Sequence, residues 1–174
     1  MDTGVLLSAI AFAAHKHRDQ RRKDRAKSPY INHPIAVAQL LWQHRVTDPA
    51  VIMAAVLHDT IEDTDATRAE LADHFGEAVA AIVVEVTDDK SLPKQRRKEL
   101  QVEHAPVLSS AAKLVKLADK TCNLRDMVDS PPHDWSDERR REYFAWAERV
   151  VAGLRGVNAS LEGAFDEQRA RGPR

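Results

Sequence analysis

Apolar residues recur along most of the chain with the spacing of one helix face. The first segment keeps this spacing from Leu6 to Ala14, and a charged, turn-like stretch follows it over 17–34. The run 81–86 is rich in β-branched residues, but no other segment could pair with it as a strand. The pattern therefore predicts an all-α fold. Further helices are expected over residues 34–44, 49–58, 68–75, 77–87, 92–104, 109–128, 136–156 and 158–170, the last fraying toward the C-terminus.

The starts of several predicted helices carry capping signals. A polar residue that can accept a hydrogen bond from the first turn stands shortly before a proline or three residues before a glutamate. Gly76 is the predicted stop of the helix over 68–75. The capping candidates are Asn32 before Pro34, Thr47 or Asp48 before Pro49, and Thr67 before Glu70.

The most apolar segment, residues 51–57, runs directly into four ionisable residues. A helix that is apolar on every side is buried all round, so His58 and Asp59 are expected at the end of a core helix. Glu62 and Asp63 follow one turn later and place a second pair of carboxylates above the first. Unpaired buried carboxylates are costly, and a divalent cation beside the helix is one way to remove that cost.

Two ligands are too few to hold such an ion, so others must come from elsewhere in the chain. His33 stands next to the helix-opening Pro34 and is one candidate. Asp119 is the other, because it shares a helical stripe with Lys116 and Asn123 at the border of an apolar stripe. An aspartate in that place is expected to face a positive charge.

Composition narrows the class of protein. The chain has 174 residues, the size of one domain, and a formal net charge of −1 that argues against a dedicated duplex DNA binder. A single cysteine, Cys122, allows no intrachain disulfide and favours a reducing compartment. The sequence contains no apolar run of about 18 residues and no leader-like N-terminus. We therefore expect a cytoplasmic protein without nucleic-acid or membrane partners, whose oligomeric state is not predicted.

The pattern formed by these residues resembles that of a known protein family. His33, the pair His58-Asp59 and Asp119 match the H…HD…D pattern of the HD-domain metal-dependent phosphohydrolases. The inner motif "HDTIED" has the form found in the alarmone hydrolases of the RelA/SpoT family, and "AKLVKLADKTCNLRDM" is similar to their small stand-alone members. The resemblance covers about residues 8–165. It implies a single helical HD domain over residues 1–174, with no room for a synthetase domain.

The resemblance also implies the chemistry of the site. It assigns a manganese ion to His33, His58, Asp59 and Asp119, and it makes Glu62 and Asp63 the catalytic pair. The expected reaction is Mn²⁺-dependent removal of the 3′-pyrophosphate of (p)ppGpp by an activated water, which gives GDP or GTP and pyrophosphate. Which of the two acids takes the proton of the water stays open.

Several cations are candidates for holding the anionic substrate. By resemblance, Arg22 and Lys23 lie near the base and phosphates, although a solvated loop is the alternative for this basic run. Asn123 is expected at the ribose or the bridging phosphate. Weaker candidates for the 5′-diphosphate are Lys90, Lys94, Arg139 and Tyr143.

Two other functions remain open. One is a different HD-type nucleotide phosphohydrolase, in particular a phosphatase that removes the 2′-phosphate of NADPH. The other is a non-catalytic module that senses a nucleotide, against which the Glu62-Asp63 pair argues. Trp42, Trp135 and Trp146 are interpreted as core residues, with a base-stacking surface as the alternative.

Overall fold

A computed structural model describes residues 3–132 and 134–173, and within these ranges it contains helices and no extended strand. The all-α prediction is therefore confirmed, and the β-branched run 81–86 lies in a helix. The elements are α1 (Thr3–Lys16), α2 (Asn32–Gln43), α3 (Pro49–Leu57), α4 (Thr60–Asp63), α5 (Arg68–Phe75), α6 (Glu77–Val86), α7 (Lys94–His104), the 3₁₀ turn η1 (Ala105–Val107), α8 (Ser110–Asp129), α9 (Asp137–Ala152) and α10 (Ala159–Ala170).

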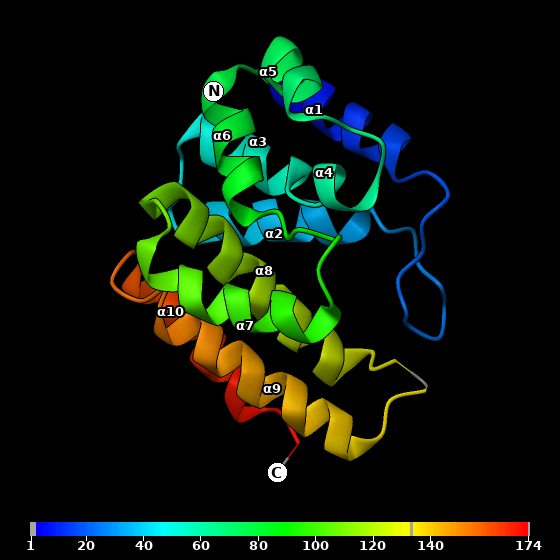
Figure 1. Cartoon of the computed structure of the whole chain (residues 1–174), viewed down its shortest axis with the longest axis vertical. Coiled ribbons are helices and arrows are strands. Elements are labelled where there is room, and N and C mark those ends of the chain that lie inside the picture. Colours follow the sequence, from blue (N-terminus) through cyan, green and yellow to red (C-terminus); the bar gives the residue numbers. More distant parts are fainter. Residues whose placement is uncertain (1–2, 133, 174) are drawn as a thin grey trace.

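The helix α8 crosses the middle of the molecule (Figure 1). The helices α2, α3 and α6 pack on one side of it, and α9 and α10 pack on the other. Every residue from Val51 to Leu57 in α3 is buried, as the all-round apolar pattern predicts. Since α2, α3 and α8 are neighbours, polar groups at their ends and edges can meet inside the fold.

Most of the predicted helix starts carry their caps. The carboxylate of Asp48 accepts the backbone N–H of Ala50 at 2.8 Å, and the hydroxyl of Thr67 accepts that of Glu70 at 3.2 Å. The prediction for Asn32 is wrong: it is the first helical residue of α2, and Ile31 precedes it without a side-chain cap. The chain before α2 is already turned, so Pro34 continues a helix that starts earlier.

The acidic motif does not continue the core helix. The helix α3 ends at Leu57, a turn holds His58 and Asp59, and the short α4 then begins at Thr60. Side-chain donors explain the break, because the Thr60 hydroxyl donates to the carbonyl of Leu57 at 2.7 Å and competes with the backbone ladder. The helix predicted over 49–58 therefore ends one residue earlier, and Glu62 and Asp63 reach the same chamber as His58 and Asp59 from α4.

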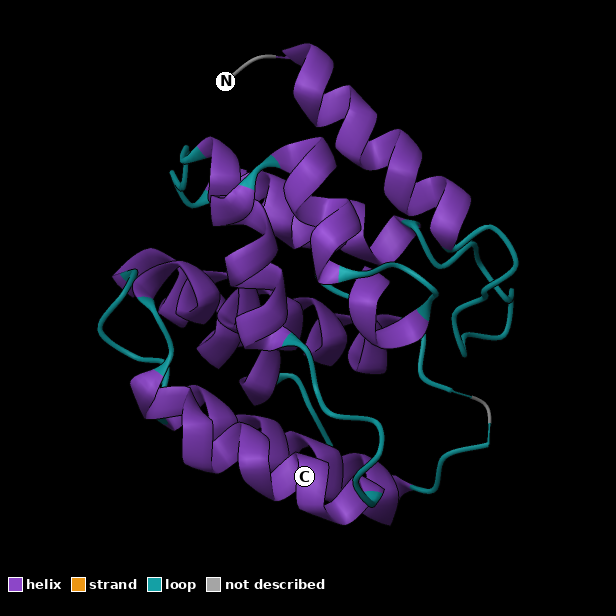
Figure 2. Ribbon diagram, turned by 45° about the horizontal axis from the view of Figure 1, so that its top comes forward, coloured by secondary structure: helices purple, strands orange, loops and turns teal. Residues whose placement is uncertain are grey.

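Two long loops lie on the same side of the molecule, on the right in Figures 1 and 2. The first spans residues 17–31 and is closed by an isolated bridge between Arg21 and Pro29. The second joins α8 to α9 and includes Trp135. Residues of both loops line one pocket.

The three tryptophans differ in burial. Trp146 is in the core, as predicted, and Trp135 is half-buried in the loop before α9. Trp42 is 57% exposed on α2, so its assignment to the core is wrong. No helix in the described parts of the chain combines the length and apolarity needed to cross a membrane.

Candidate metal centre and nucleotide pocket

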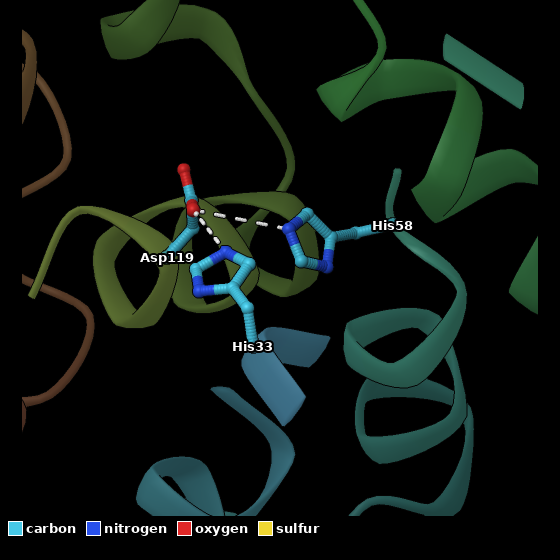
Figure 3. Close-up of side chains that lie close together, drawn as sticks. All are labelled: His33, His58 and Asp119. Atoms are coloured by element: carbon cyan, nitrogen blue, oxygen red, sulfur yellow. Dashed lines mark hydrogen bonds and ion pairs between the residues drawn. The ribbon is translucent and has the colours of Figure 1, made fainter. Parts of the chain in front are cut away.

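Three of the four predicted metal ligands converge at one point (Figure 3). His33 comes from the start of α2, His58 from the turn after α3 and Asp119 from the middle of α8. The Nε2 atoms of His33 and His58 lie 3.1 and 3.8 Å from Oδ1 of Asp119, and all three residues are buried. One ligand atom of each lies within 4.8 Å of the others, which suits a single ion.

The tautomer of His58 leaves a ligand nitrogen free. Its Nδ1 lies 2.7 Å from the carbonyl oxygen of Ala55, which can only accept, so Nδ1 carries the proton. Its Nε2 is buried and has no hydrogen-bond partner, although Asp59 Oδ2 lies 3.1 Å away. A neutral imidazole held in this way is the usual form of a metal-ligating histidine.

The electrostatics around His58 also favour a cation. Burial alone would lower the pKa of His58, but the nearby Asp59 and Asp119 carboxylates outweigh it and raise the pKa to about 10. A proton on Nε2 is therefore stabilised where a metal ion could take its place. Two imidazoles and carboxylates, with no thiolate in the cluster, fit a divalent transition metal.

Asp59 flanks this cluster. Its Oδ2 accepts the Tyr30 hydroxyl at 2.5 Å and lies beside His58, but Asp59 is not within the compact three-residue group. Burial would raise the pKa of Asp59, while the charge of His58 outweighs it and lowers the pKa. Asp59 as a fourth ligand stays a prediction, and the contact from Tyr30 was not foreseen.

Asp119 has its own supporting contacts. The ammonium of Lys120 lies 3.1 Å from Oδ2, and Asn123 donates to Oδ1 at 2.5 Å. Lys120 is buried and lies 4.6 Å from the ring centre of Trp146. Although burial opposes it, the charge of Lys120 and the hydrogen bonds from the histidines lower the pKa of Asp119. The Asp119 carboxylate is thus paired with Lys120 through Oδ2, and its Oδ1 faces the two histidines.

Glu62 and Asp63 line the same chamber, a cavity of about 180 Å³ that contains the cluster. The backbone N–H of Asp88 donates to Glu62 Oε2 at 3.0 Å, and Arg97 lies 3.8 Å from Oε1. Burial raises the pKa of Glu62, and the charge of Asp88 adds to that effect. Asp63 is paired with the ammonium of Lys90, one of the predicted cations.

A larger pocket of about 550 Å³ adjoins the chamber. The two cavities share the side chains of Tyr30, His33, Asp63 and Asn123. Four of the predicted substrate contacts, Arg22, Lys23, Asn123 and Tyr143, line the outer pocket together with Trp135. The lining also includes the acids Asp24, Asp63 and Asp126, of which Asp63 and Asp126 are paired with Lys90 and Arg22. The pocket thus combines basic side chains with aromatic rings, which suits a nucleotide.

Three predicted contacts lie outside the lining of this pocket: Lys90, which is paired with Asp63, Lys94 and Arg139. Lys94 is exposed at the start of α7. The guanidinium carbon of Arg139 lies 4.1 Å from the ring centre of Trp135, which lines the pocket. All three remain predictions as substrate contacts.

Arg22 is held in place by a residue that the sequence did not point to. Its NH2 lies 2.5 Å from Oδ2 of Asp126 and 3.4 Å from Oδ1 of Asn123. Its guanidinium carbon lies 5.7 Å from the ring centre of Tyr30. The spacing of Asp126, one helix turn beyond Asn123, was the only available signal for its presence here.

The sequence profile of the HD domain matches residues 9–149. The chain belongs to the HD-domain family. This HD domain is 57% identical over 166 residues to guanosine-3′,5′-bis(diphosphate) 3′-pyrophosphohydrolase MESH1 of Xenopus tropicalis, covering 95% of the chain and 93% of that relative. The human protein of the same name is 58% identical over 165 residues, covering 94% of the chain and 92% of the relative.

A solved structure shares the whole HD domain. It is described as a metazoan ortholog of SpoT that hydrolyses ppGpp, and it matches with a TM-score of 0.95 and 49% identity. The match covers 100% of this chain and 99% of that one. The resemblance to the small alarmone hydrolases is therefore confirmed, as is the prediction that this HD domain is an enzyme of the hydrolase class.

Proposed function

We propose that the chain, as a single HD domain over residues 1–174, hydrolyses the 3′-pyrophosphate of (p)ppGpp to GDP or GTP and pyrophosphate. The observation that carries this proposal is the direct junction between the His33, His58 and Asp119 cluster and the outer pocket. A nucleotide bound among cations and aromatic rings there would present a phosphoryl group to the cluster. The names of the relatives at 57% and 58% identity support the same substrate.

His33, His58 and Asp119 would hold the metal, with Asp59 as the fourth ligand, and we propose Mn²⁺ as the ion. When bound, a divalent ion supplies Lewis acidity that lowers the pKa of a water and polarises a phosphoryl oxygen. Lys120 and Tyr30 orient the two carboxylates, Asp119 and Asp59, so that their remaining lone pairs face the histidines.

Glu62 accepts the proton of the attacking water in this proposal. Its raised pKa brings it closer to neutral pH, where a general base is most effective, and the Asp88 N–H fixes its orientation. The water oxygen bonds to the phosphorus, the bond from phosphorus to the ribose 3′ oxygen breaks, and that oxygen takes up a proton. The proton that Glu62 has taken from the water returns to the 3′ oxygen. Asp63, paired with Lys90, lines both the chamber and the outer pocket and is placed to relay that proton.

Arg22, Lys23, Asn123 and Tyr143 contact the nucleotide. Asn123 contacts both Asp119 and Arg22, which supports its proposed position at the ribose, between the metal cluster and the outer pocket. Arg22 offers a flat cation between Tyr30 and Asp126 on which a base can stack. Lys94 and Arg139 are proposed for the 5′-diphosphate, which would extend toward the Trp135 side of the pocket.

The test is product analysis. Purified protein with Mn²⁺ and ppGpp should release GDP and pyrophosphate, and no orthophosphate should appear without an added pyrophosphatase. A protein that binds ppGpp with Mn²⁺ but releases no product would be a sensor, and the proposal would fail. Parallel incubation with NADPH tests the 2′-phosphatase alternative, since a strong preference for NADPH with release of orthophosphate would replace the substrate named above.

The proposed compartment is the cytoplasm. The single cysteine, Cys122, is buried in the core, where burial raises the pKa of its thiol to about 12 and leaves it unreactive. A small nucleotide is the only partner that the proposal requires.

A further inference from the structure

Two buried lysines on α8 differ in how their charges are neutralised. Lys120 is paired with Asp119 at 3.1 Å. Lys116 donates to the carbonyl oxygen of Val86 at 2.9 Å, and its nearest carboxylate, Asp88 Oδ1, is 4.0 Å away. Since the side chain of Lys116 is only 11% exposed, its ammonium is buried without a close counter-charge.

Asp88 does not supply a close counter-charge for Lys116. Its Oδ2 accepts Gln101 Nε2 at 2.6 Å, so the carboxylate is oriented toward a neutral donor. Burial lowers the pKa of Lys116 and the charge of Lys120 lowers it further, which together outweigh the opposing charges of Asp88, Asp119 and Glu62. An ammonium in this setting retains donor capacity for an anion that enters the cavity beside it.

The space beside Lys116 continues past the metal cluster. Lys116 lines the inner chamber and also a rear cavity of about 170 Å³, and the two share Asp88 and Gln101 as well. The rear cavity and the outer pocket have no lining residue in common, so the chamber lies between them. The three cavities thus form a series with the metal cluster in the middle.

The rear cavity offers a second donor. Arg97 lines it, and the Nε of Arg97 is buried with no hydrogen-bond partner. Carboxylates line the cavity too, but hydrogen-bond donors already occupy them: Glu85 accepts the N–H of Ser109, and Asp89 accepts the N–H and hydroxyl of Ser91. Lys116 and Arg97 therefore keep N–H donors without a partner among the described residues, whereas Glu85 and Asp89 already accept hydrogen bonds.

We propose that Lys116, with Arg97 behind it, binds the distal phosphate of a 3′-diphosphate. The inference deepens the proposed function and depends on it. A nucleoside in the outer pocket would place its first 3′ phosphate at the cluster, and a second phosphate would extend toward Lys116, which lines the chamber where it meets the rear cavity. The subsite thereby selects a diphosphate over a monophosphate at the ribose.

Direct binding of two unhydrolysable ligands tests this assignment. Both are ppGpp analogues with a methylene group in place of the 3′ oxygen, one carrying two phosphorus groups there and the other only one. Titration calorimetry with the Mn²⁺-loaded enzyme should show that wild type prefers the diphosphate analogue by about tenfold or more, the effect of one hydrogen bond to a charged group. Equal affinities in wild type overturn the proposal without any variant.

The variant Lys116→Met then locates the preference. This variant should lower the affinity for the diphosphate analogue by about tenfold to a hundredfold and the affinity for the monophosphate analogue by less than about twofold. Lys113→Met is the matched control, because Lys113 lies on the same helix outside the three cavities, and it should leave both affinities unchanged. Equal weakening of both analogues in Lys116→Met would indicate general damage and contradict the subsite.

The two proposals fail in different ways. Absence of ppGpp turnover by wild type with Mn²⁺ defeats the proposed function. Turnover of ppGpp together with equal affinities for the two analogues defeats only the subsite.

Discussion

The substitution Asp119→Asn separates the structural role of Asp119 from its role as a metal ligand. It keeps the shape of the side chain and removes the charge that faces Lys120 on one oxygen and His33 on the other. The side chains of Asp119 and Lys120 are 11% and 6% exposed, so the pair is buried. In the metal-free protein the variant leaves the Lys120 ammonium without a counter-charge.

Removing one partner of a buried ion pair costs about 3–5 kcal/mol, and the lower end applies because the asparagine still accepts a hydrogen bond. For a chain of this length, about 3 kcal/mol corresponds to a fall in Tm of roughly 6–12 °C. The double variant Asp119→Asn/Lys120→Met removes the stranded charge and should recover at least half of this loss. A buried methionine also keeps the contact with Trp146.

Metal binding should not recover. With Mn²⁺ at about 100 times its dissociation constant, wild type should gain about 2.7 kcal/mol, and both variants should lose most of this gain. Urea unfolding with and without a chelator measures the free energies, and thermal unfolding gives the matching Tm values. A double variant as unstable as the single one would refute the account of Lys120, and an undiminished Mn²⁺ effect in Asp119→Asn would refute its assignment as a ligand.

The remaining predictions concern catalysis, pH and folding. Glu62→Gln should reduce kcat by about 10²–10⁴-fold in a pyrophosphate-release assay and keep the Mn²⁺-dependent rise in Tm, since Glu62 lies outside the ligand cluster; loss of both would make it a ligand. Because burial raises the pKa of Glu62 and a base must be deprotonated, turnover should be present above that raised pKa and fall as the pH drops through it. A pH–rate profile that instead declines only on the alkaline side would make Glu62 the acid. Asp48→Ala should remove the cap of α3 and lower the free energy of unfolding by about 1 kcal/mol, with kcat unchanged.

Local patterns predicted the helices well because their signals lie within a few residues of each end. Asp48 and Thr67 cap their helices as expected, and residues 51–57 form the buried rod that their apolar pattern indicates. The start of α2 at Asn32 and the end of α3 at the acidic motif were harder to predict. At Asn32 the turns of the preceding loop start the helix earlier than Pro34 suggests, and at the acidic motif the Thr60 hydroxyl competes with the backbone hydrogen bonds of α3. The spacing of apolar residues registers neither effect.

The site could be predicted in part. His33, His58 and Asp119 were named from their unusual places beside apolar segments and from their match to a family pattern, and they meet in space. Trp42 shows the opposite outcome, because an aromatic side chain at helical spacing is exposed here. Which face of a helix is covered depends on its neighbours, so spacing alone does not decide it.

The sequence by itself determined the all-α fold, the core helix α3 and the identity of the groups that can bind a metal, because those properties follow from local spacing and residue chemistry. Only the tertiary structure decided that Lys116 and Lys120 are buried, since lysines on a helix are otherwise expected in water. It also brought Tyr30 to Asp59 and Asp126 to Arg22 across long stretches of chain. These contacts depend on how α8 packs against its neighbours, and that packing sets which charges are neutralised and which remain available to a phosphate.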